Sequence, residues 1–346
     1  MMVAVYHNEV ENRKKMNQQV NNWFLSGHEW AVQQLSRAIA NQRIGHAYLL
    51  TGPAHIGKTT FAKAFAMALN CESTLRPCGE CRSCRLIAQD GHVDVTIVEA
   101  DRVGGTLKID QIRELQHMLA LRPYEATYRV AILRRFQEAN PATQNAILKT
   151  LEEPASSVIL ILTVEYIDQI LPTILSRCQI INLRPLSSEQ VYNALLSQFD
   201  TDPSTLELIA RLSGGRIGWA IRTAHDPSQL EQRNVAIQQL SDILANKSRV
   251  ERFKIAEFLS KDKDTLRIHL DYWITFWRDV MLLASGSSAE IINVDYSDRL
   301  KELARRLDYK TAHQALEHTR QATVQLGQNV NTRLAIEVLL LRYPAG

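Results

Sequence analysis

The sequence lacks several features that would assign a chain to a class at once. No apolar stretch approaches the roughly 18 residues of a membrane-spanning helix, and the opening MMVAVYHNEVENRKKMNQQ has neither the apolar core nor the small-residue cleavage site of a signal peptide. One-sided charge is missing too, because 40 Lys and Arg stand against 37 Asp and Glu, a formal balance of +3. These absences predict a cytoplasmic protein without a membrane partner, in which any contact with nucleic acid is local.

Cysteine is almost absent outside one short segment. Of five cysteines, four fall in the stretch CESTLRPCGECRSC, residues 71–84, and in a reducing compartment such crowding favours a metal over disulfides. Two C-x-x-C steps can close a tetrahedral Zn²⁺ site, and the absence of a further local ligand indicates a structural metal. An iron–sulfur cluster and four unligated thiols are the alternatives. The predicted ligands are Cys71, Cys78, Cys81 and Cys84.

The length predicts more than one domain. At 346 residues the chain exceeds one ordinary core, and about 100–200 residues per domain gives two or three. Up to about residue 183 short apolar runs alternate with helical periodicity, which is typical of an α/β unit with a parallel sheet, and after Pro185 only helical patterns follow. The predicted parts are a disordered or loosely attached segment 1–20, an α/β domain 21–185, a small helical domain 186–227 and an all-α domain 228–346.

Individual elements can also be read from the pattern. The expected strands are the apolar runs 47–50, 95–98, 130–133, 158–163 and 180–183. The expected helices have apolar faces, such as Phe61, Phe65 and Leu69, or capping signals, such as Asn140 before Pro141. In the C-terminal part, the predictions are helices near 187–199, 206–212 and 218–224, a core stripe at Leu270, Trp273, Trp277 and Met281, a loop at 285–297 and a closing helix at 331–344.

A phosphate-binding loop lies between the first predicted strand and helix. GPAHIGKT, residues 52–59, fits G-x-x-x-x-G-K-[ST] in the context that the motif requires, and the alternative is a glycine-rich turn that only matches the pattern. The backbone N–H groups attract phosphate, Lys58 can reach the terminal phosphates, and Thr59 can offer its hydroxyl to Mg²⁺. The predicted nucleotide-binding residues here are Gly52, Gly57, Lys58, Thr59 and Thr60.

The strand that would supply catalytic acids ends on cations instead. In YRVAILRRFQ, residues 128–137, the apolar run is followed by Arg134 and Arg135. A P-loop enzyme holds Mg²⁺ with its Thr and a strand-end Asp while a neighbouring acid orients water, so we predict very slow hydrolysis. Glu138 is an alternative acid that would have to reach back from the next loop. Two interpretations of the P-loop stay open: it binds nucleotide for structure, or it is a remnant that serves the fold.

An arginine precedes the last predicted strand. In LPTILSRCQIINL, residues 171–183, Arg177 lies where it could project towards a neighbouring molecule, and an arginine supplied in trans can stabilise charge on a transferred phosphoryl group. The alternative is an ordinary solvated surface arginine. Cys178 beside it is expected to be a small buried residue.

Three stretches belong together: RIGHAYLLTGPAHIGKTT, NAILKTLEEP (residues 145–154) and LPTILSRC, and the four-cysteine insert accompanies them. In combination they resemble the bacterial clamp-loader subunits of DNA polymerase III, within the AAA+ superfamily. The resemblance is close from about Trp23 to Leu186 and looser beyond, where WRDVMLL and NTRLAIEVLLLRYP are similar to the family's oligomerising collar domain. It implies an AAA+ P-loop domain with a zinc insert at 71–84, then a helical lid and an all-α collar.

The resemblance also distinguishes two kinds of subunit. Gamma and tau, the motor subunits, carry an acidic pair where this chain has Arg134 and Arg135, whereas delta-prime commonly does not. It therefore implies a delta-prime-type stator in a hetero-pentamer with gamma/tau and delta, which loads the sliding clamp onto primed DNA in an ATP-dependent reaction. Arg177 would complete the ATP site of the adjacent motor subunit, and Thr163 matches the residue that senses the γ-phosphate.

The implied chemistry follows from these positions. Within the DNA polymerase III holoenzyme such a subunit has little or no ATPase activity of its own, holds a structural Zn²⁺, and keeps ATP or ADP as candidate ligands, while the missing acids argue against a complete Mg²⁺ shell. The lid arginine of motor subunits would fall near Gly218, two positions from Arg216. The alternatives are an active gamma/tau-like ATPase and a zinc module that reads nucleic acid through Arg76, Arg82 and Arg85.

Overall fold

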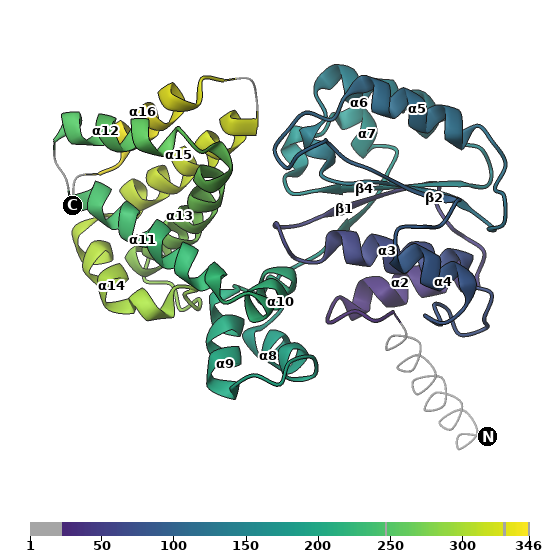
Figure 1. The fold of residues 1–346 in the computed structure, drawn as a ribbon, viewed down its shortest axis with the longest axis horizontal. Coiled ribbons are helices and arrows are strands. Elements are labelled where there is room, and N and C mark those ends of the chain that lie inside the picture. The colour runs from purple at the N-terminus through teal and green to yellow at the C-terminus, as the bar shows by residue number, and fades with distance from the viewer. Residues whose placement is uncertain (1–22, 246–247, 328–329, 345–346) are drawn as a thin grey trace. The chain divides into compact units, whose positions relative to one another are not determined.

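The computed structural model describes residues 23–245, 248–327 and 330–344 (Figure 1). The chain divides into two compact units, one formed by the described part of Met1–Leu186 with Arg216–Gly218, the other by Ser187–Gly215 and the described part of Trp219–Gly346. The predicted loose segment 1–20 lies outside the described residues. Among the helices that are described, none is long and apolar enough to cross a membrane.

The first unit is built on a five-stranded sheet in which every neighbouring pair is parallel. The strand order is β2-β3-β4-β1-β5. All five predicted strands are confirmed, each to within one residue at either end, and β1, β3 and β4 are buried along their whole length because both faces of the sheet are covered. The strands are β1 Ala47–Thr51, β2 Val95–Val98, β3 Arg129–Leu133, β4 Val158–Val164 and β5 Gln179–Asn182.

Helices cover both faces of this sheet (Figure 1). One face carries α2 (Glu29–Ala40), α3 (Lys58–Asn70) and α4 (Arg82–Ala88), and the other carries α5 (Ile109–Leu119), α6 (Pro141–Glu152) and α7 (Pro172–Leu175). Two separate apolar clusters fill the two layers, the first around Phe61 and Phe65 and the second around Ile112 and Ile147. The expected α/β class with a parallel sheet is therefore correct.

Local signals in the sequence account for several of these helices. Phe61, Phe65 and Leu69 are all buried on α3, as their four-residue spacing predicts. Asn140 caps α6 by accepting a hydrogen bond from the Thr143 N–H at 2.9 Å, and Pro141 occupies the first turn. The short helices η1 (Phe136–Glu138) and η2 (Ile167–Gln169) follow β3 and β4.

A buried ion pair fixes the loop that precedes β3. Asp94 is fully buried; its carboxylate accepts N–H hydrogen bonds from Tyr124, Glu125 and Ala126 and lies 2.9 Å from a guanidinium nitrogen of Arg129. Although burial alone would raise the pKa of Asp94, these donors together hold it below its ordinary value. The pair thus holds the segment before β3 against the start of β2.

The second unit is helical throughout the part that is described. The helices predicted near 187–199, 206–212 and 218–224 are confirmed as the first three, and Ser187 caps the first of them by accepting the Gln190 N–H. The helices are α8 Ser188–Leu196, α9 Pro203–Leu212, α10 Ile217–His225, α11 Ser228–Ala245, α12 Arg249–Leu259, α13 Lys263–Ala284, α14 Ser297–Arg306, α15 Tyr309–Gly327 and α16 Thr332–Arg342, with a short η3 Val294–Tyr296. The further division into a lid, 186–227, and a collar, 228–346, stays a prediction.

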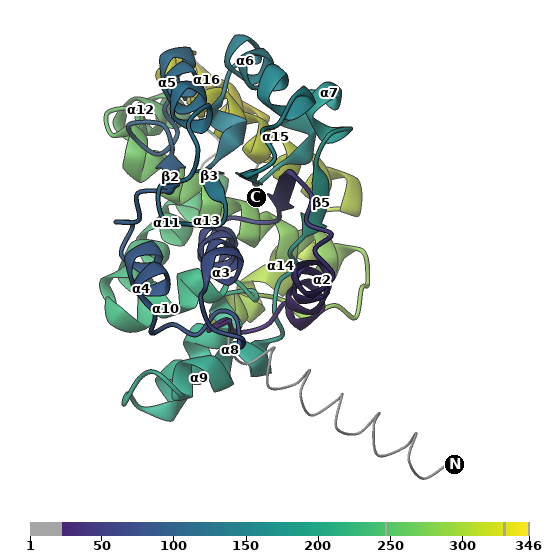
Figure 2. The same cartoon turned by 90° about the vertical axis from the view of Figure 1, so that its right-hand side faces the viewer.

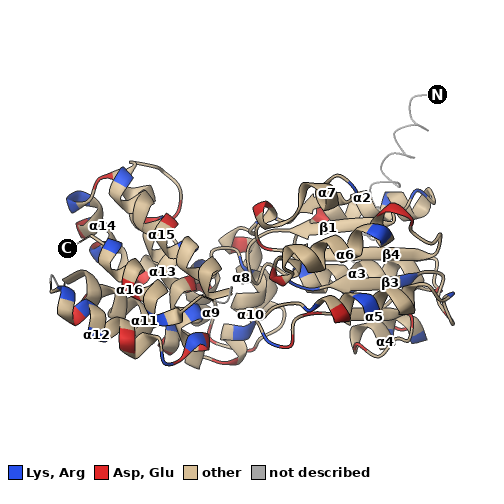
Figure 3. Cartoon of the chain, turned by 90° about the horizontal axis from the view of Figure 1, so that it is seen from above, with Lys and Arg blue, Asp and Glu red and all other residues tan. Residues whose placement is uncertain are grey.

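The core of the second unit contains the predicted aromatic stripe. Leu270, Trp273 and Trp277 on α13 are fully buried, and the partly buried Met281 packs against the same cluster. The loop after α13 is tied back by Arg233, whose guanidinium forms two hydrogen bonds with the Asp295 carboxylate at 2.7 and 2.9 Å. Over both units, cationic and anionic residues are interspersed along the outer helices, in keeping with the small net charge (Figure 3).

Candidate functional site

The P-loop joins β1 to α3, and steric constraints explain why two of its positions are glycine. Gly52 has φ +147°, and a Cβ there would lie 2.4 Å from the Leu183 carbonyl oxygen, so a side chain has no room. Gly57, the N-cap of α3, has φ +99°, a conformation that L side chains rarely adopt. The loop backbone therefore has the shape that brings N–H groups to the start of a helix, where phosphate is attracted.

The Lys58 side chain folds back onto the backbone of the P-loop. Its ammonium donates hydrogen bonds to the carbonyl oxygens of Gly52 and Pro53, both at 2.7 Å. Burial lowers the pKa of Lys58 to about 8, and the negative charge of Glu165 opposes that shift. Thr59 is partly buried and Thr60 exposed on the first turn of α3. This donor set fits a phosphate group, to which Lys58 could turn.

The strand-end arginines are engaged in ion pairs with a residue that follows β2. Arg134 contacts one oxygen of the Glu99 carboxylate at 3.1 Å, and Arg135 contacts the other at 2.7 Å. The contact arises because β2 and β3 are neighbours, so residues that follow the two strands meet at the same edge. Both guanidinium groups thus point towards the β2 side of the sheet.

Glu138 is also part of this network. Its carboxylate lies 3.0 Å from the Arg135 Nε and accepts the Gly104 N–H at 2.7 Å, with only 6% of the side chain exposed. The alternative acid of the sequence analysis is therefore committed to an ion pair and to the loop between β2 and α5. We call the group formed by Glu99, Gly104, Arg134, Arg135 and Glu138 the arginine brace.

Thr163 and Glu165 lie at the end of β4. The Thr163 side chain is buried, and its hydroxyl accepts the Arg135 N–H at 3.0 Å, so it supports the turn after β3. Glu165 follows Val164, which is in register with Thr51 just before the P-loop. Its charge acts on Lys58, as the pKa of that lysine indicates. The end of β3 presents the two arginines of the brace in place of a carboxylate.

The segment Arg216–Gly218 belongs to the first unit and lies against the P-loop. The Gly218 N–H donates to the His55 carbonyl at 2.8 Å, and a Cβ at Gly218 would lie 2.8 Å from the same oxygen. Ile217 lies within van der Waals distance of a Cβ built at Gly57. Close backbone packing therefore leaves little room for a side chain at Gly218, near which the resemblance to motor subunits would put an arginine.

The four predicted cysteine ligands come together. Their sulfur atoms all lie within 4.8 Å of one another. Backbone N–H groups donate hydrogen bonds to three of the sulfurs at 3.3–3.4 Å. The Cys78 N–H donates to the Cys71 sulfur, the Cys81 N–H to the Cys78 sulfur and the Cys84 N–H to the Cys81 sulfur. The N–H of Cys81 is the main cause that lowers the pKa of Cys78 to about 7, whereas burial raises the pKa of Cys71 and Cys84. Four cysteine sulfurs held this way could bind a metal such as zinc.

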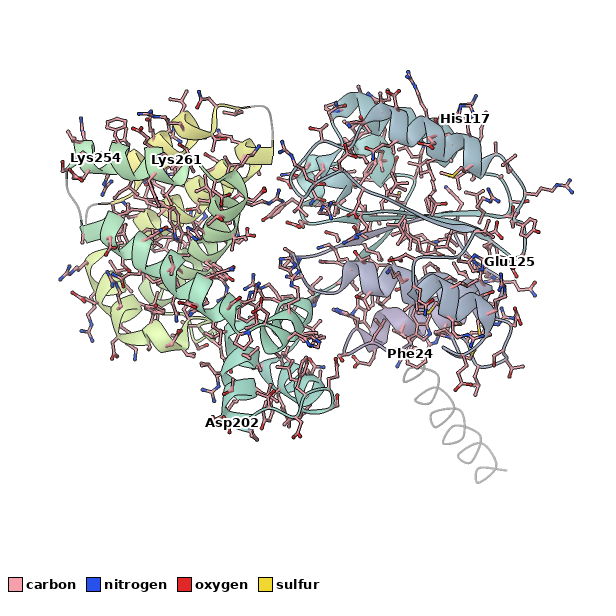
Figure 4. The ribbon with its side chains drawn as sticks, in the orientation of Figure 1. Phe24, His117, Glu125, Asp202, Lys254 and Lys261 are labelled. Carbon is pink, nitrogen blue, oxygen red and sulfur yellow. The ribbon has the colours of Figure 1, made fainter. Side chains whose placement is uncertain are left out.

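The segment around this cluster is attached to α3. Cys71 is the C-cap of α3, and Cys84 lies in α4, a short helix that the cysteine spacing did not predict and that packs beside α3 (Figure 2). The Phe24 ring covers Gly79, where a Cβ would come within 2.7 Å of it, and Arg82 pairs with Glu125 at 3.3 Å. Figure 4 labels Phe24 and Glu125 beside this region. One arginine of the possible nucleic-acid reader is therefore already paired with an acid.

Arg177 lies between α7 and β5, on the surface of the first unit. Its guanidinium contacts the Glu152 carboxylate at 2.9 Å, and about a third of the side chain, 35%, is exposed. Cys178 beside it is only partly buried, not fully as expected, but it packs against the second apolar cluster. Burial raises its pKa to about 12, so it is a packing residue rather than a reactive thiol.

Three acids of the site were missed by the sequence analysis. Glu99, Glu152 and Glu165 directly follow, or end, the elements β2, α6 and β4. Acids at the carboxyl ends of neighbouring parallel strands were a usable signal for Glu99 and Glu165. The partner of each, however, depends on the strand order, which the sequence did not reveal.

Comparison with known proteins agrees with this architecture. The model for "DNA polymerase III, delta subunit" matches residues 27–187, and that for its C-terminal part matches residues 227–344. The chain is 26% identical to the delta-prime subunit of Bacillus subtilis DNA polymerase III, over 91% of this chain and 95% of that protein. It is also 26% identical to the tau subunit of the same organism, over 91% of this chain but only 60% of tau.

Among solved structures, a gamma subunit-related protein of Thermotoga maritima aligns over 89% of this chain and 97% of its own, with 13% identity and a TM-score of 0.40. The two family models together take in most of the chain, and both Bacillus subtilis relatives are subunits of DNA polymerase III. The chain therefore belongs to the DNA polymerase III clamp-loader family of delta-prime, gamma and tau subunits.

Proposed function

We propose that this chain is a delta-prime-type stator of the clamp loader, with little or no ATPase activity of its own. The observation that carries the proposal is the arginine brace: the end of β3 presents Arg134 and Arg135, and both are held in ion pairs with Glu99. Phosphoryl transfer needs a metal shell and a group that orients water, and a pair of guanidinium groups supplies neither. The P-loop then serves nucleotide binding or the fold, without turnover.

ATP hydrolysis tests the proposal directly. The purified chain is expected to hydrolyse ATP negligibly, and Lys58→Ala is expected to change that background little, because the lysine has no catalytic acids to work with. The measurement is phosphate release with and without the motor subunits. A turnover of about one per second from the chain alone, abolished by Lys58→Ala, would make a motor subunit the better description.

The proposed role in the assembly lies with Arg177. In a hetero-pentamer with gamma/tau and delta, its partly exposed guanidinium would meet the γ-phosphate of ATP on the adjacent motor subunit and so help to load the sliding clamp onto primed DNA. The planar fork suits a phosphate, which it can contact through two parallel hydrogen bonds. This chain would contact clamp and DNA through the complex.

The cysteine cluster is proposed as a structural Zn²⁺ site. We expect about one Zn²⁺ per chain by metal analysis, since four thiolates within 4.8 Å match a closed tetrahedral shell. Cys84→Ser should abolish the zinc content, and Cys178→Ser, at the one cysteine outside the cluster, should retain it. An iron chromophore, or a zinc-free wild-type protein prepared under reducing conditions without chelator, contradicts the assignment.

An active gamma/tau-like ATPase is the second candidate. It is favoured by the intact P-loop, by the tau relative and by Glu165, an acid close enough to Lys58 to affect its pKa. Against it stands the brace, in which the remaining acid of the β3 loop, Glu138, is bound to Arg135 and Gly104.

A further inference from the structure

The guanidinium of Arg177 is held by three groups of its own chain. Nη2 lies 2.9 Å from the Glu152 carboxylate, while Nη1 donates to the Thr173 carbonyl at 2.8 Å and to the Ser176 hydroxyl at 3.2 Å. Glu152 is the last residue of α6, and the other two groups belong to α7 and its C-cap. Contacts from two elements therefore restrict a side chain that would otherwise be a flexible surface arginine.

These contacts leave one edge of the guanidinium for another molecule. A guanidinium has five N–H donors, one on Nε and two on each Nη. Within the described residues, Nη1 donates to two acceptors, Nη2 forms the ion pair with Glu152, and Nε makes no hydrogen bond. Nε, together with the part of Nη2 that Glu152 does not use, could contact two oxygens of one phosphate.

We infer that Glu152 is the positioning residue of Arg177: its ion pair holds the partly exposed guanidinium at the surface, with Nε left to meet a phosphate of the neighbouring subunit. The inference rests on the proposed role of Arg177 in trans. A side chain that is already ordered loses less rotamer entropy when it binds. A larger share of its interaction energy with the phosphate is then available to stabilise the transition state.

The segment Leu151–Pro154 at the end of α6, with the sequence LEEP, offers a matched control for this inference. Glu152 and Glu153 are adjacent, both exposed and equally charged, but the carboxylate in contact with Arg177 is that of Glu152, whereas Glu153 is the C-cap of α6. If the charge of these residues acted generally on ATP binding or on assembly, Glu152→Gln and Glu153→Gln would change the reactivity of Arg177 and the ATPase equally. If Glu152 positions Arg177, only Glu152→Gln changes them.

The experiment combines two readouts on Glu152→Gln, Glu153→Gln and Glu152→Asp. On the full chain alone, phenylglyoxal labelling of Arg177 is followed by peptide mass spectrometry, with labelling of Arg184 as the internal reference. In the complex with delta and gamma/tau, the kcat and KM of the DNA-stimulated ATPase are measured. Labelling needs no ATPase function, so it remains informative if Arg177→Ala leaves the ATPase unchanged and the proposed function fails.

The expected result is specific to Glu152→Gln. Labelling of Arg177 rises by roughly two- to fivefold, the factor that the energy of an exposed ion pair allows. The kcat falls by a smaller factor, because the motor sites without this arginine keep their own turnover, while the KM for ATP stays constant. Glu153→Gln behaves as wild type, and Glu152→Asp restores part of the loss. Unchanged labelling overturns the inference. Where Arg177→Ala lowers the ATPase of the complex, raised labelling with an unchanged or higher kcat overturns it too, since a higher kcat would mark Glu152 as a competitor of the phosphate.

Discussion

Restoring acids at the end of β3, by Arg134→Asp together with Arg135→Glu, is expected to destabilise the protein without creating an ATPase. Arg135 is only 14% exposed and pairs with both Glu99 and Glu138, so the exchange would place four carboxylates in one small region. Breaking a buried pair by removing one partner costs about 3–5 kcal/mol, because the other charge is left unpaired. Denaturant unfolding measures the loss, and phosphate release checks for ATPase activity.

Two further variants test whether the loss of stability comes from the broken contacts of the arginine brace or only from the change in net charge. Arg102→Asp with Arg122→Glu makes the same charge change at exposed arginines of the same unit and should alter the free energy of unfolding little. Arg134→Lys with Arg135→Lys keeps the charges and should lie in between, since an ammonium cannot bridge two acids as a guanidinium does. An acid-restored variant that is as stable as wild type and hydrolyses ATP would show that the arginines alone separate this chain from a motor.

Much of the fold follows from signals that act over a few residues. The strands were predictable because each is a short apolar run between turn residues, and α6 because Asn140 and Pro141 cap its first turn. The stripe of Leu270, Trp273 and Trp277 identified a core helix in the same way. The P-loop and the cysteine cluster were predictable because their residues lie close together in the sequence. Phosphate binding and tetrahedral metal coordination require a fixed spacing between such residues.

The contacts that give the site its character act over longer distances. Glu99 and Arg134 are 35 residues apart, and Glu152 ends α6 whereas Arg177 follows α7. Their pairing depends on the strand order β2-β3-β4-β1-β5 and on how α6 and α7 pack. A sequence can show that two arginines replace acids, whereas the acids that hold them become visible only when β2 lies beside β3.

Arg177→Ala is expected to leave folding and assembly nearly intact and to lower the DNA-stimulated ATPase of the reconstituted complex. The side chain is partly exposed and its pair with Glu152 is a surface pair, so its loss removes little stability. At the one site that it completes, an arginine in trans can contribute roughly 10³–10⁵ in rate. The measurements are unfolding of the isolated chain, size-exclusion chromatography of the complex, and ATP turnover and clamp loading on primed DNA.

The size of the bulk effect depends on how the sites work together. The motor sites without this arginine keep their own turnover, so total hydrolysis should fall less than clamp loading if loading needs the sites to act together. Arg177→Lys should rescue poorly, because an ammonium keeps the charge but loses the planar fork. Arg184→Ala, at an exposed arginine of the same unit, is the control and should load clamps as wild type does. If Arg177→Ala also loads clamps at the wild-type rate while Lys58→Ala stops loading, the stator proposal fails, and the P-loop of this chain must then be an active site despite the arginine brace.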